Sequence, residues 1–548
     1  MSFIRQTAPV LPTPAAGTFR QVVESFVLLA VAVLLFRGFA AEGFMISTGS
    51  MAPTLLGYHR RVVCPDCGFE FARGASEEAS DTEAIARDKY DIGFEEPSDI
   101  RCPNCSLTAI PFSTLPRTEG DQLLVHKHAY EFRDPRRWEV IVFRNPAEPR
   151  EAYVKRVAGL PGEQIEIRGG EVFANGVLCR KPLDVQRAIK VPFARFVNRT
   201  SGADTDVQSG WQTAESRSRW SISGKNPAFD GLAGPTQIET EWLTYRHWIR
   251  AGGRHSSSVP LARWPVKLSF PEGEYSSIQF AEGRLACVGV LSDLERRTWL
   301  ARCDDPEFQL AINQLFEQSH LAPLVDESGY NSVDEIGEHT VDEFFTSFTL
   351  HQVSGQGRIE IRLRDSTNMF AAVLDFGSRE CRLLRNDDPI PVRQCTWKPD
   401  LPTDQIQVDF SLFDNQATLA INGAPALEPF PYEAEGEPLP VRMPLQLGAA
   451  NLSFQVTNLT LARDVYYVSK AEKDAPPVQL GPDEFFVLGD NSPVSVDSRV
   501  WAEPAVPRRA LIGKPLVVHL PSNSRRLQWN GQNHDVRVPD FSRARVVR

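Results

Sequence analysis

Alternation of apolar and polar residues in the second half of the chain constrains the fold more than any other sequence feature. Apolar residues occupy every second position in residues 359–363, and residues 405–423 repeat the pattern on both sides of an Asp-Asn turn. A period of two is typical of strands with one buried face. Closely spaced strands of this kind predict a β-sandwich. The residues expected on its buried faces are Ile359, Ile361, Leu363, Ile406, Val408, Phe410, Leu412, Ala417, Leu419 and Ile421.

The overall composition is that of a globular protein with several domains. The chain has 548 residues, of which 42% are hydrophobic and 24% charged. At roughly 150 residues per domain, this length favours three to four domains. The formal net charge is −11. A nucleic-acid-binding protein needs a basic surface, so we expect no nucleic-acid partner.

An apolar segment near the N-terminus is the membrane signal in this sequence. Residues 26–36 are uninterrupted apolar, which is shorter than the ~20 residues that span a bilayer. A longer span places Glu24 and Arg37 near its ends, where charged side chains reach the interface. We therefore predict an uncleaved anchor at residues 21–43, after a flexible tail at residues 1–20. Arg5 and Arg20 precede the span and favour a cytoplasmic N-terminus. A cleavable signal peptide is the alternative.

Two CPxC pairs stand 34 residues apart in the sequence, and the other five cysteines are scattered. Paired CPxC knuckles supply four thiolates in the manner of a zinc ribbon. We predict such a unit at residues 61–107, holding a structural zinc ion. Disulfide bonds, which an oxidising compartment would favour, and free thiols are the alternatives. The four ligands are Cys64, Cys67, Cys102 and Cys105.

Motifs of common serine hydrolases are missing from the sequence. There is no G-x-S-x-G motif, and none of the ten histidines lies in a recognisable triad motif. A lysine can replace histidine as general base if burial in an apolar pocket disfavours its ammonium form. Lys155 fits this requirement, because Tyr153 and Val154 precede it and residues 140–143 read VIVF.

Three sequence boxes resemble those of type I signal peptidases, and they occur in the order of that family. TGSMAPTL (residues 48–55) follows the predicted anchor, and YVKRVAGLPGE (residues 153–163) contains Lys155. GDNSPVSVDSR (residues 489–499) matches the family's GDN-x-x-x-S-x-D-S-R box. The resemblance implies a mainly β catalytic core, with one N-terminal transmembrane helix and the β-sandwich as an insert. That core would comprise residues 44–60, 108–194 and 465–520.

The resemblance also implies a role for individual residues. Ser50 would be the nucleophile and Lys155 the general base of a Ser–Lys dyad. The Ser50 N–H and the Thr48 hydroxyl would form the oxyanion hole. Ser495 would orient the lysine amine, and catalysis would need no cofactor. The other supporting residues are Arg156, Gly489, Asp490, Asn491, Asp497 and Arg499.

Shallow apolar subsites are implied next to the dyad, and they would select Ala-x-Ala before the cleaved bond. Ser47 stands where the family commonly has proline, a departure that puts the local strand geometry in doubt. The residues that match subsite positions are Phe44, Ile46, Met51, Leu55, Val142, Tyr153 and Val154.

Residues 195–464 form a long insert, irregular and Trp-rich at first and then all-β. The phrase ATLAINGAP (residues 417–425) is similar to a strand of laminin-G and concanavalin-like sandwiches. Such a sandwich could bind a glycan, bind a partner protein or shield the active site. Residues 521–548 are polar and basic, and we expect a mobile tail.

These observations predict a membrane-bound serine endopeptidase that removes signal peptides from exported preproteins. It would cross the cell membrane once, with lipid and preproteins as partners and its catalytic domain on the extracytoplasmic side. The alternative is a membrane-tethered binding protein that uses the peptidase core as scaffold. A self-cleaving repressor would need a basic DNA-binding domain and no anchor. A secreted hydrolase with a lectin module would not need a serine beside the membrane.

Overall fold

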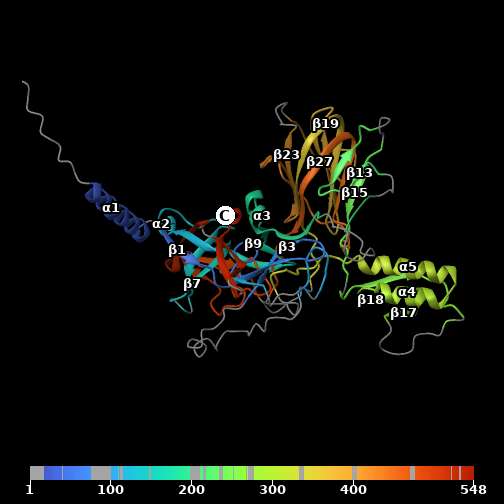
Figure 1. The fold of residues 1–548 in the computed structure, drawn as a ribbon, viewed down its shortest axis with the longest axis horizontal. Coiled ribbons are helices and arrows are strands. Elements are labelled where there is room, and N and C mark those ends of the chain that lie inside the picture. Colours follow the sequence, from blue (N-terminus) through green and yellow to red (C-terminus); the bar gives the residue numbers. More distant parts are fainter. Residues whose placement is uncertain are drawn as a thin grey trace, which may run out of the picture.

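The computed structural model describes most of the chain. The described residues are 18–39, 41–75, 100–108, 110, 115–146, 148, 150–197, 210–213, 218–233, 239–250, 252–266, 268, 277–331, 339–397, 404–469, 476–519, 521–529 and 532–548. Strands dominate, so the protein is mainly β, as predicted. Figure 1 shows an N-terminal helix, a central β core, and the strands of the insert to one side of that core.

The N-terminal helix α1 (Thr18–Phe39) contains most of the predicted anchor. It projects away from the rest of the described chain (Figure 1). Among the described residues, we find no helix of sufficient length and apolarity to span a bilayer. The end of the predicted anchor belongs to strand β1 (Ala41–Met45) instead of the helix. Residues 1–17 of the flexible tail expected at residues 1–20 lie outside the described residues. Residues 18–20 form the start of α1 instead of a flexible tail.

The central core is an antiparallel sheet in the order β1-β5-β31-β6-β7-β29-β30, with β34 beside β31. Strands that precede the insert (β5, β6 and β7) pair with strands that follow it (β31 and β29). The two parts of the chain on either side of the insert therefore form one sheet. One face of the sheet buries Leu123, Val125, Val140 and Val142. Ile141 belongs to the cluster on the other face. The elements here are β5 (Gln122–His126), α2 (Ala129–Phe132), β6 (Val140–Arg144), β7 (Ala152–Gly159), β29 (Glu484–Leu488), β30 (Val506–Pro507), η2 (Arg508–Ala510), β31 (Leu511–Val518), η3 (Phe541–Arg543) and β34 (Arg545–Val546).

A small second sheet, in the order β10-β9-β8-β28, packs beside the core together with helix α3. Its hairpin turns at Asn175 and Gly176, which both have positive φ. This is the Asn-Gly turn expected for a tight hairpin, and the prediction is confirmed. The elements are β8 (Gln164–Arg168), β9 (Glu171–Ala174), β10 (Val177–Leu178), α3 (Leu183–Ile189) and β28 (Val478–Gln479).

The insert contains a sandwich built around two long strands, β19 (Phe344–Arg364) and β27 (Leu445–Arg463). They pair with each other along most of their length, with bulges near Gly355. The first half of β19 pairs with β23 and its second half with β20, so β19 and β27 belong to both sheets. Every apolar residue that the alternation placed on a buried face is buried. The remaining strands are β11 (Val191–Arg195), β12 (Trp211–Thr213), β13 (Trp220–Ser221), β14 (Ala228–Asp230), β15 (Glu241–Tyr245), β20 (Met369–Asp375), β21 (Glu380–Arg385), β22 (Arg393–Thr396), β23 (Gln405–Phe413), β24 (Gln416–Ile421), β25 (Ala424–Pro425) and β26 (Phe430–Pro431).

Between β15 and β19 in the sequence lies a separate unit, in a region that we expected to be irregular. It has three strands, β16 (Ser256–Pro260), β17 (Ile278–Ala281) and β18 (Arg284–Val288), and two helices, α4 (Asp293–Arg302) and α5 (Pro306–His320). A capping box at Ser292 begins α4, and the Asp305 side chain caps α5. The apolar residues of α5 recur at helical spacing and fill a separate hydrophobic cluster.

Two boundaries differ from the sequence expectation. Strand β11, which we assigned to the catalytic core, pairs with β27 of the sandwich, because it continues the insert's own sheet. Residues 521–548, for which we expected a mobile tail, contain the paired strands β32 (Ser522–Trp529) and β33 (Gln532–Pro539). The chain end also pairs with β31 and buries Val547, which explains why it is ordered despite its polar composition.

Candidate active site

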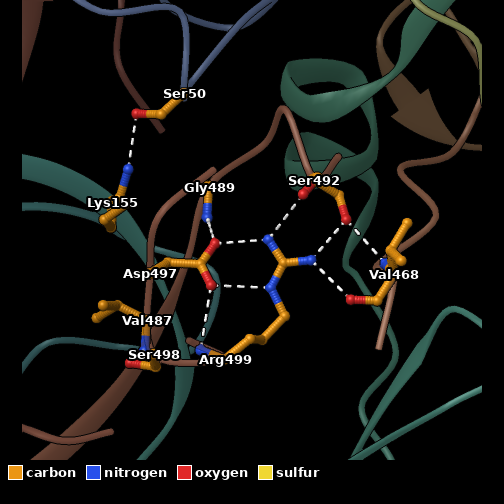
Figure 2. Close-up of polar contacts among 9 residues, drawn as sticks. All are labelled: Ser50, Lys155, Val468, Val487, Gly489, Ser492, Asp497, Ser498 and Arg499. Atoms are coloured by element: carbon orange, nitrogen blue, oxygen red, sulfur yellow. Dashed lines mark hydrogen bonds and ion pairs between the residues drawn. The ribbon is translucent and has the colours of Figure 1, made fainter. Parts of the chain in front are cut away.

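The proposed nucleophile and base meet at one end of the central sheet. Ser50 lies in the turn that follows β1, and Lys155 lies on β7 between β6 and β29. The Lys155 Nζ atom is 2.6 Å from Ser50 Oγ (Figure 2). Lys155 is only 3% exposed, whereas Ser50 is half-buried and accessible. A buried amine in hydrogen-bond contact with an accessible hydroxyl is the geometry that a Ser–Lys dyad needs.

Gly489 is where the GDN box touches the nucleophile loop. A Cβ atom at this position would clash with Ser495 Oγ and would lie 2.5 Å from the Ser50 carbonyl oxygen. Only glycine allows this approach, so the box and the nucleophile loop pack backbone against backbone. The resemblance implied a supporting role for Gly489, and this close packing is a physical reason for glycine at that position.

We expect Gly489→Ala to lower kcat about 100-fold, because an added methyl group displaces Ser50 from Lys155 and such misplacements have effects of this size. The measurement is the steady-state rate of the preprotein cleavage expected from the sequence, beside the melting temperature. Gly224→Ala is the matched control, since a Cβ there meets only ordinary contacts. Wild-type kcat in folded Gly489→Ala would contradict the close packing.

Asp497 and Arg499 form a buried ion pair beneath the dyad (Figure 2). The Arg499 Nε atom lies 2.8 Å from Asp497 Oδ1, and Asp497 Oδ2 accepts the Gly489 N–H at 2.9 Å. Arg499 also donates to the Ser492 hydroxyl and the Val468 carbonyl. The pair therefore fixes the box from within.

The pKa of Asp497 lies below its ordinary value. Burial is the largest effect and acts in the opposite direction, but the hydrogen bonds and charge of Arg499 and the Gly489 N–H outweigh it. A carboxyl with a lowered folded-state pKa stabilises the protein above its unfolded pKa. That contribution is lost as the pH falls through the folded value.

Arg156 and Asp490 form a second ion pair with no exposed surface. Arg156 Nε and Nη2 lie 2.8 and 2.7 Å from the two Asp490 oxygens, and Nη1 donates to the Trp138 carbonyl. Arg156 follows Lys155 on β7 and points to the other side of the strand. It thus holds the GDN box against β7, so that the lysine and the box keep their positions.

Asn491 holds the nucleophile loop directly. Its N–H donates to the Ser50 carbonyl at 3.0 Å, and its Nδ2 donates to the Gly49 carbonyl at 3.0 Å. Its partner, Asn331, comes from the insert and was not predicted from the sequence. No motif or periodicity marks Asn331 in the sequence.

The predicted subsite residues divide into two groups. Six of the seven belong to, or pack against, one hydrophobic cluster, and Tyr153 packs in a second cluster on the other face of β7, where its ring centroid lies 5.9 Å from Lys155 Nζ. Met51, Leu55 and Val142 are at most 1% exposed and form the base of that cluster. Phe44, Tyr153 and Val154 are half-buried, which leaves surface for a substrate side chain. Thr48 is exposed two residues before Ser50, and Ser495 is buried beside Gly489.

The four CPxC cysteines converge in a separate unit. It contains strands β2 (His59–Val63), β3 (Glu70–Gly74) and β4 (Arg117–Thr118). All four Sγ atoms lie within 4.8 Å of one another, with Cys64 to Cys105 at 3.6 Å and Cys67 to Cys102 at 3.5 Å. A disulfide bond needs about 2.05 Å. A tetrahedron with Zn–S bonds of ~2.3 Å places sulfurs about 3.8 Å apart, so the four thiolates fit a structural zinc site.

Sequence comparisons find that parts of this chain are similar to signal peptidases. The sequence profile of the family described as "Signal peptidase, peptidase S26" matches residues 112–218 and 401–520, which include Lys155 and the GDN box but not Ser50. "Signal peptidase I" of Leptolyngbya laminosa is 45% identical over 73 residues, or 12% of this chain and 36% of that protein. "Probable signal peptidase I-2" of Synechocystis sp. is 37% identical over 114 residues, or 18% and 52%. The chain therefore spans about a third to a half of these relatives.

A solved structure also resembles part of the chain. The carbohydrate-binding module CBM66 from Bacillus subtilis covers 22% of this chain and 75% of its own, at 10% identity and a TM-score of 0.18. A score this low supports no inference about what the insert binds.

Proposed function

We propose that this chain, which contains a signal peptidase S26 domain, is a serine endopeptidase that removes signal peptides from preproteins. The observation that carries the proposal is the 2.6 Å contact between Ser50 Oγ and the buried Lys155 Nζ. The buried Arg156–Asp490 ion pair joins the Lys155 box to the GDN box, and Asn491 of the GDN box holds the Ser50 loop by two hydrogen bonds.

The chemistry begins with proton transfer from Ser50 Oγ to the neutral Lys155 amine. Oγ then forms a bond to the carbonyl carbon of the cleaved peptide, and the Ser50 N–H and Thr48 hydroxyl stabilise the resulting oxyanion. Lys155 passes its proton to the leaving nitrogen as the C–N bond breaks. A water molecule next gives a proton to Lys155 and attacks the acyl carbon. The bond from that carbon to Ser50 Oγ then breaks, and Oγ takes the proton back from Lys155 as the new carboxyl terminus leaves.

The substrate is proposed to be a signal peptide with small residues before the cleaved bond. Phe44 and Val154 are half-buried beside the fully buried residues Met51 and Val142, so the surface near Ser50 is apolar with a rigid base. Such a surface favours Ala-x-Ala over larger or charged side chains.

Membrane attachment is proposed through α1. Its described side chains from residue 20 to 31 are exposed, and Phe26, Leu28 and Leu29 are each more than 60% exposed. Contiguous apolar exposure of this kind marks an interaction surface. The helix leads directly into β1 and the nucleophile loop, so attachment there would bring Ser50 close to a membrane-embedded signal peptide. In this proposal the chain crosses the membrane once, and its catalytic domain lies on the extracytoplasmic side.

The test is cleavage of a preprotein whose signal ends in Ala-x-Ala, by detergent-solubilised wild type and Ser50→Ala. We expect wild type to cut after the last alanine and Ser50→Ala to be inactive, because the hydroxyl is the attacking group. Mass spectrometry of the products locates the bond. The proposal fails if folded wild-type protein leaves the preprotein intact, or if Ser50→Ala cuts equally well.

A further inference from the structure

We propose that Asn331, a residue of the insert, is a positioning residue for the oxyanion hole and acts through Asn491. The idea rests on the proposed function and deepens it. Asn331 lies outside all three sequence boxes and 160 residues before Asn491. It belongs to the segment between α5 and β19, so the insert contributes to the catalytic scaffold.

The two asparagine side chains form a closed pair of hydrogen bonds. Asn331 Nδ2 donates to Asn491 Oδ1 at 2.8 Å, and Asn491 Nδ2 donates to Asn331 Oδ1 at 2.7 Å. Both residues are buried, with exposed fractions of 6% and 3%. An unpartnered amide here would pay a desolvation cost, so each side chain fixes the orientation of the other.

The second hydrogen of Asn491 Nδ2 points to the catalytic loop. It donates to the Gly49 carbonyl at 3.0 Å. That carbonyl and the Ser50 N–H belong to one planar peptide unit, in which the C=O and N–H point in opposite directions. Holding the Gly49 carbonyl therefore aims the Ser50 N–H, the proposed oxyanion-hole donor.

Tyr330, the neighbour of Asn331, fixes the same loop by packing. A Cβ atom at Gly49 would clash with the Tyr330 ring, and the ring packs with Ala52 and Leu56. Its hydroxyl donates to the Tyr58 carbonyl at 3.0 Å, and its own carbonyl accepts the Gly74 N–H at 2.9 Å. The insert segment thus contacts the nucleophile loop directly through the Tyr330 ring and indirectly through the Asn331–Asn491 pair.

A role in aiming the oxyanion donor has a specific kinetic signature. The Ser50 N–H meets a full negative charge only in the transition state, so its misorientation lowers kcat and changes KM little. Loss of an oxyanion donor lowers the rate ~10²–10³-fold. Misorientation should cost less, and we expect about a 10- to 100-fold lower kcat for Asn331→Ala.

The experiment measures kcat and KM for wild type, Asn331→Ala, Asn331→Asp, Asn491→Ala and the double variant Asn331→Ala/Asn491→Ala. Asn331→Asp preserves size but cannot donate to Asn491 Oδ1, so its kcat should also fall. Because Asn331 acts through Asn491, the double variant should be no slower than Asn491→Ala alone. Asn368→Ala, a buried asparagine of the sandwich, is the control and should keep wild-type kcat.

Each outcome supports or overturns the proposal. A fall in kcat at nearly constant KM, together with non-additivity in the double variant, supports it. Wild-type kcat in both Asn331 variants, or fully multiplicative effects with Asn491→Ala, overturns it while leaving the proposed function standing. Absence of cleavage by folded wild type overturns both. Melting curves of every variant separate these effects from unfolding.

Discussion

We expect replacement of Lys155 with alanine to lower kcat by about 10⁴-fold or more, the size of effect seen when a serine hydrolase loses its base. Lys155 Nζ is in hydrogen-bond contact with Ser50 Oγ, and the described residues place no other basic side chain on that oxygen. Lys155→Met should behave alike, because it keeps the apolar stem and removes the amine. Lys155→Arg should also be inactive, because a guanidinium does not give up its proton in proteins.

The measurement is single-turnover cleavage of a preprotein by each variant, with melting curves to verify folding. Lys225→Ala, which removes an exposed lysine of the insert, is the control and should match wild type. Wild-type activity should rise with pH, since only the neutral amine accepts the serine proton. An activity maximum below about pH 6, or substantial activity in Lys155→Met, would contradict the dyad.

Residues within local motifs were predictable from sequence because their chemistry is local. Ser50, Lys155 and Asp497 lie within short sequence boxes, and the spacing of residues inside each box does not depend on how the inserts fold. The alternating residues of the sandwich were predictable for the same reason, since one pleated strand sets the burial of its own side chains. The roles assigned to Ser50, Lys155, Asp497, Thr48 and Ser495 stay predictions.

Contacts between distant segments could not be predicted in this way. Asn331 and Tyr330 carry no periodicity, and their partners lie elsewhere in the chain. The helices α4 and α5 are a different case, because their signals were present in the sequence. Ser292 with Glu295 forms a capping box, and Asp305 precedes Pro306 at the first turn. These capping signals predict two helices in the region for which we expected irregular structure.

Removal of metal from the cysteine unit should be the second large effect. Structural zinc contributes ~10–16 kcal/mol to the folding of zinc-finger peptides, because the site does not exist in the unfolded chain. Here the four thiolates are buried in a small cluster with Val62, Phe69 and Ile100, whose apolar area alone is modest. We therefore expect one zinc ion per chain by elemental analysis, and its loss from Cys102→Ser.

Loss of the metal should also weaken the active site, because a backbone hydrogen bond connects the cysteine unit to the support of the nucleophile loop. The cysteine unit continues into β3, whose last residue, Gly74, donates to the Tyr330 carbonyl at 2.9 Å. Tyr330 packs on Gly49, so loosening of the unit removes one support of the nucleophile loop. Cys102→Ser should therefore show faster proteolysis within residues 61–107 and a lower kcat than wild type.

Cys287→Ser tests whether the effect belongs to the cluster, because this buried cysteine lies in the separate unit of α4 and α5. It should keep the zinc content and the proteolysis pattern of wild type. Metal-free protein whose mass is lower by two hydrogens for each of two disulfide bonds would contradict the zinc site. Joining Cys64 to Cys105 and Cys67 to Cys102 would require each sulfur pair to close from about 3.5 Å to bonding distance. The intact four-thiolate geometry instead matches the separation that one shared ion imposes.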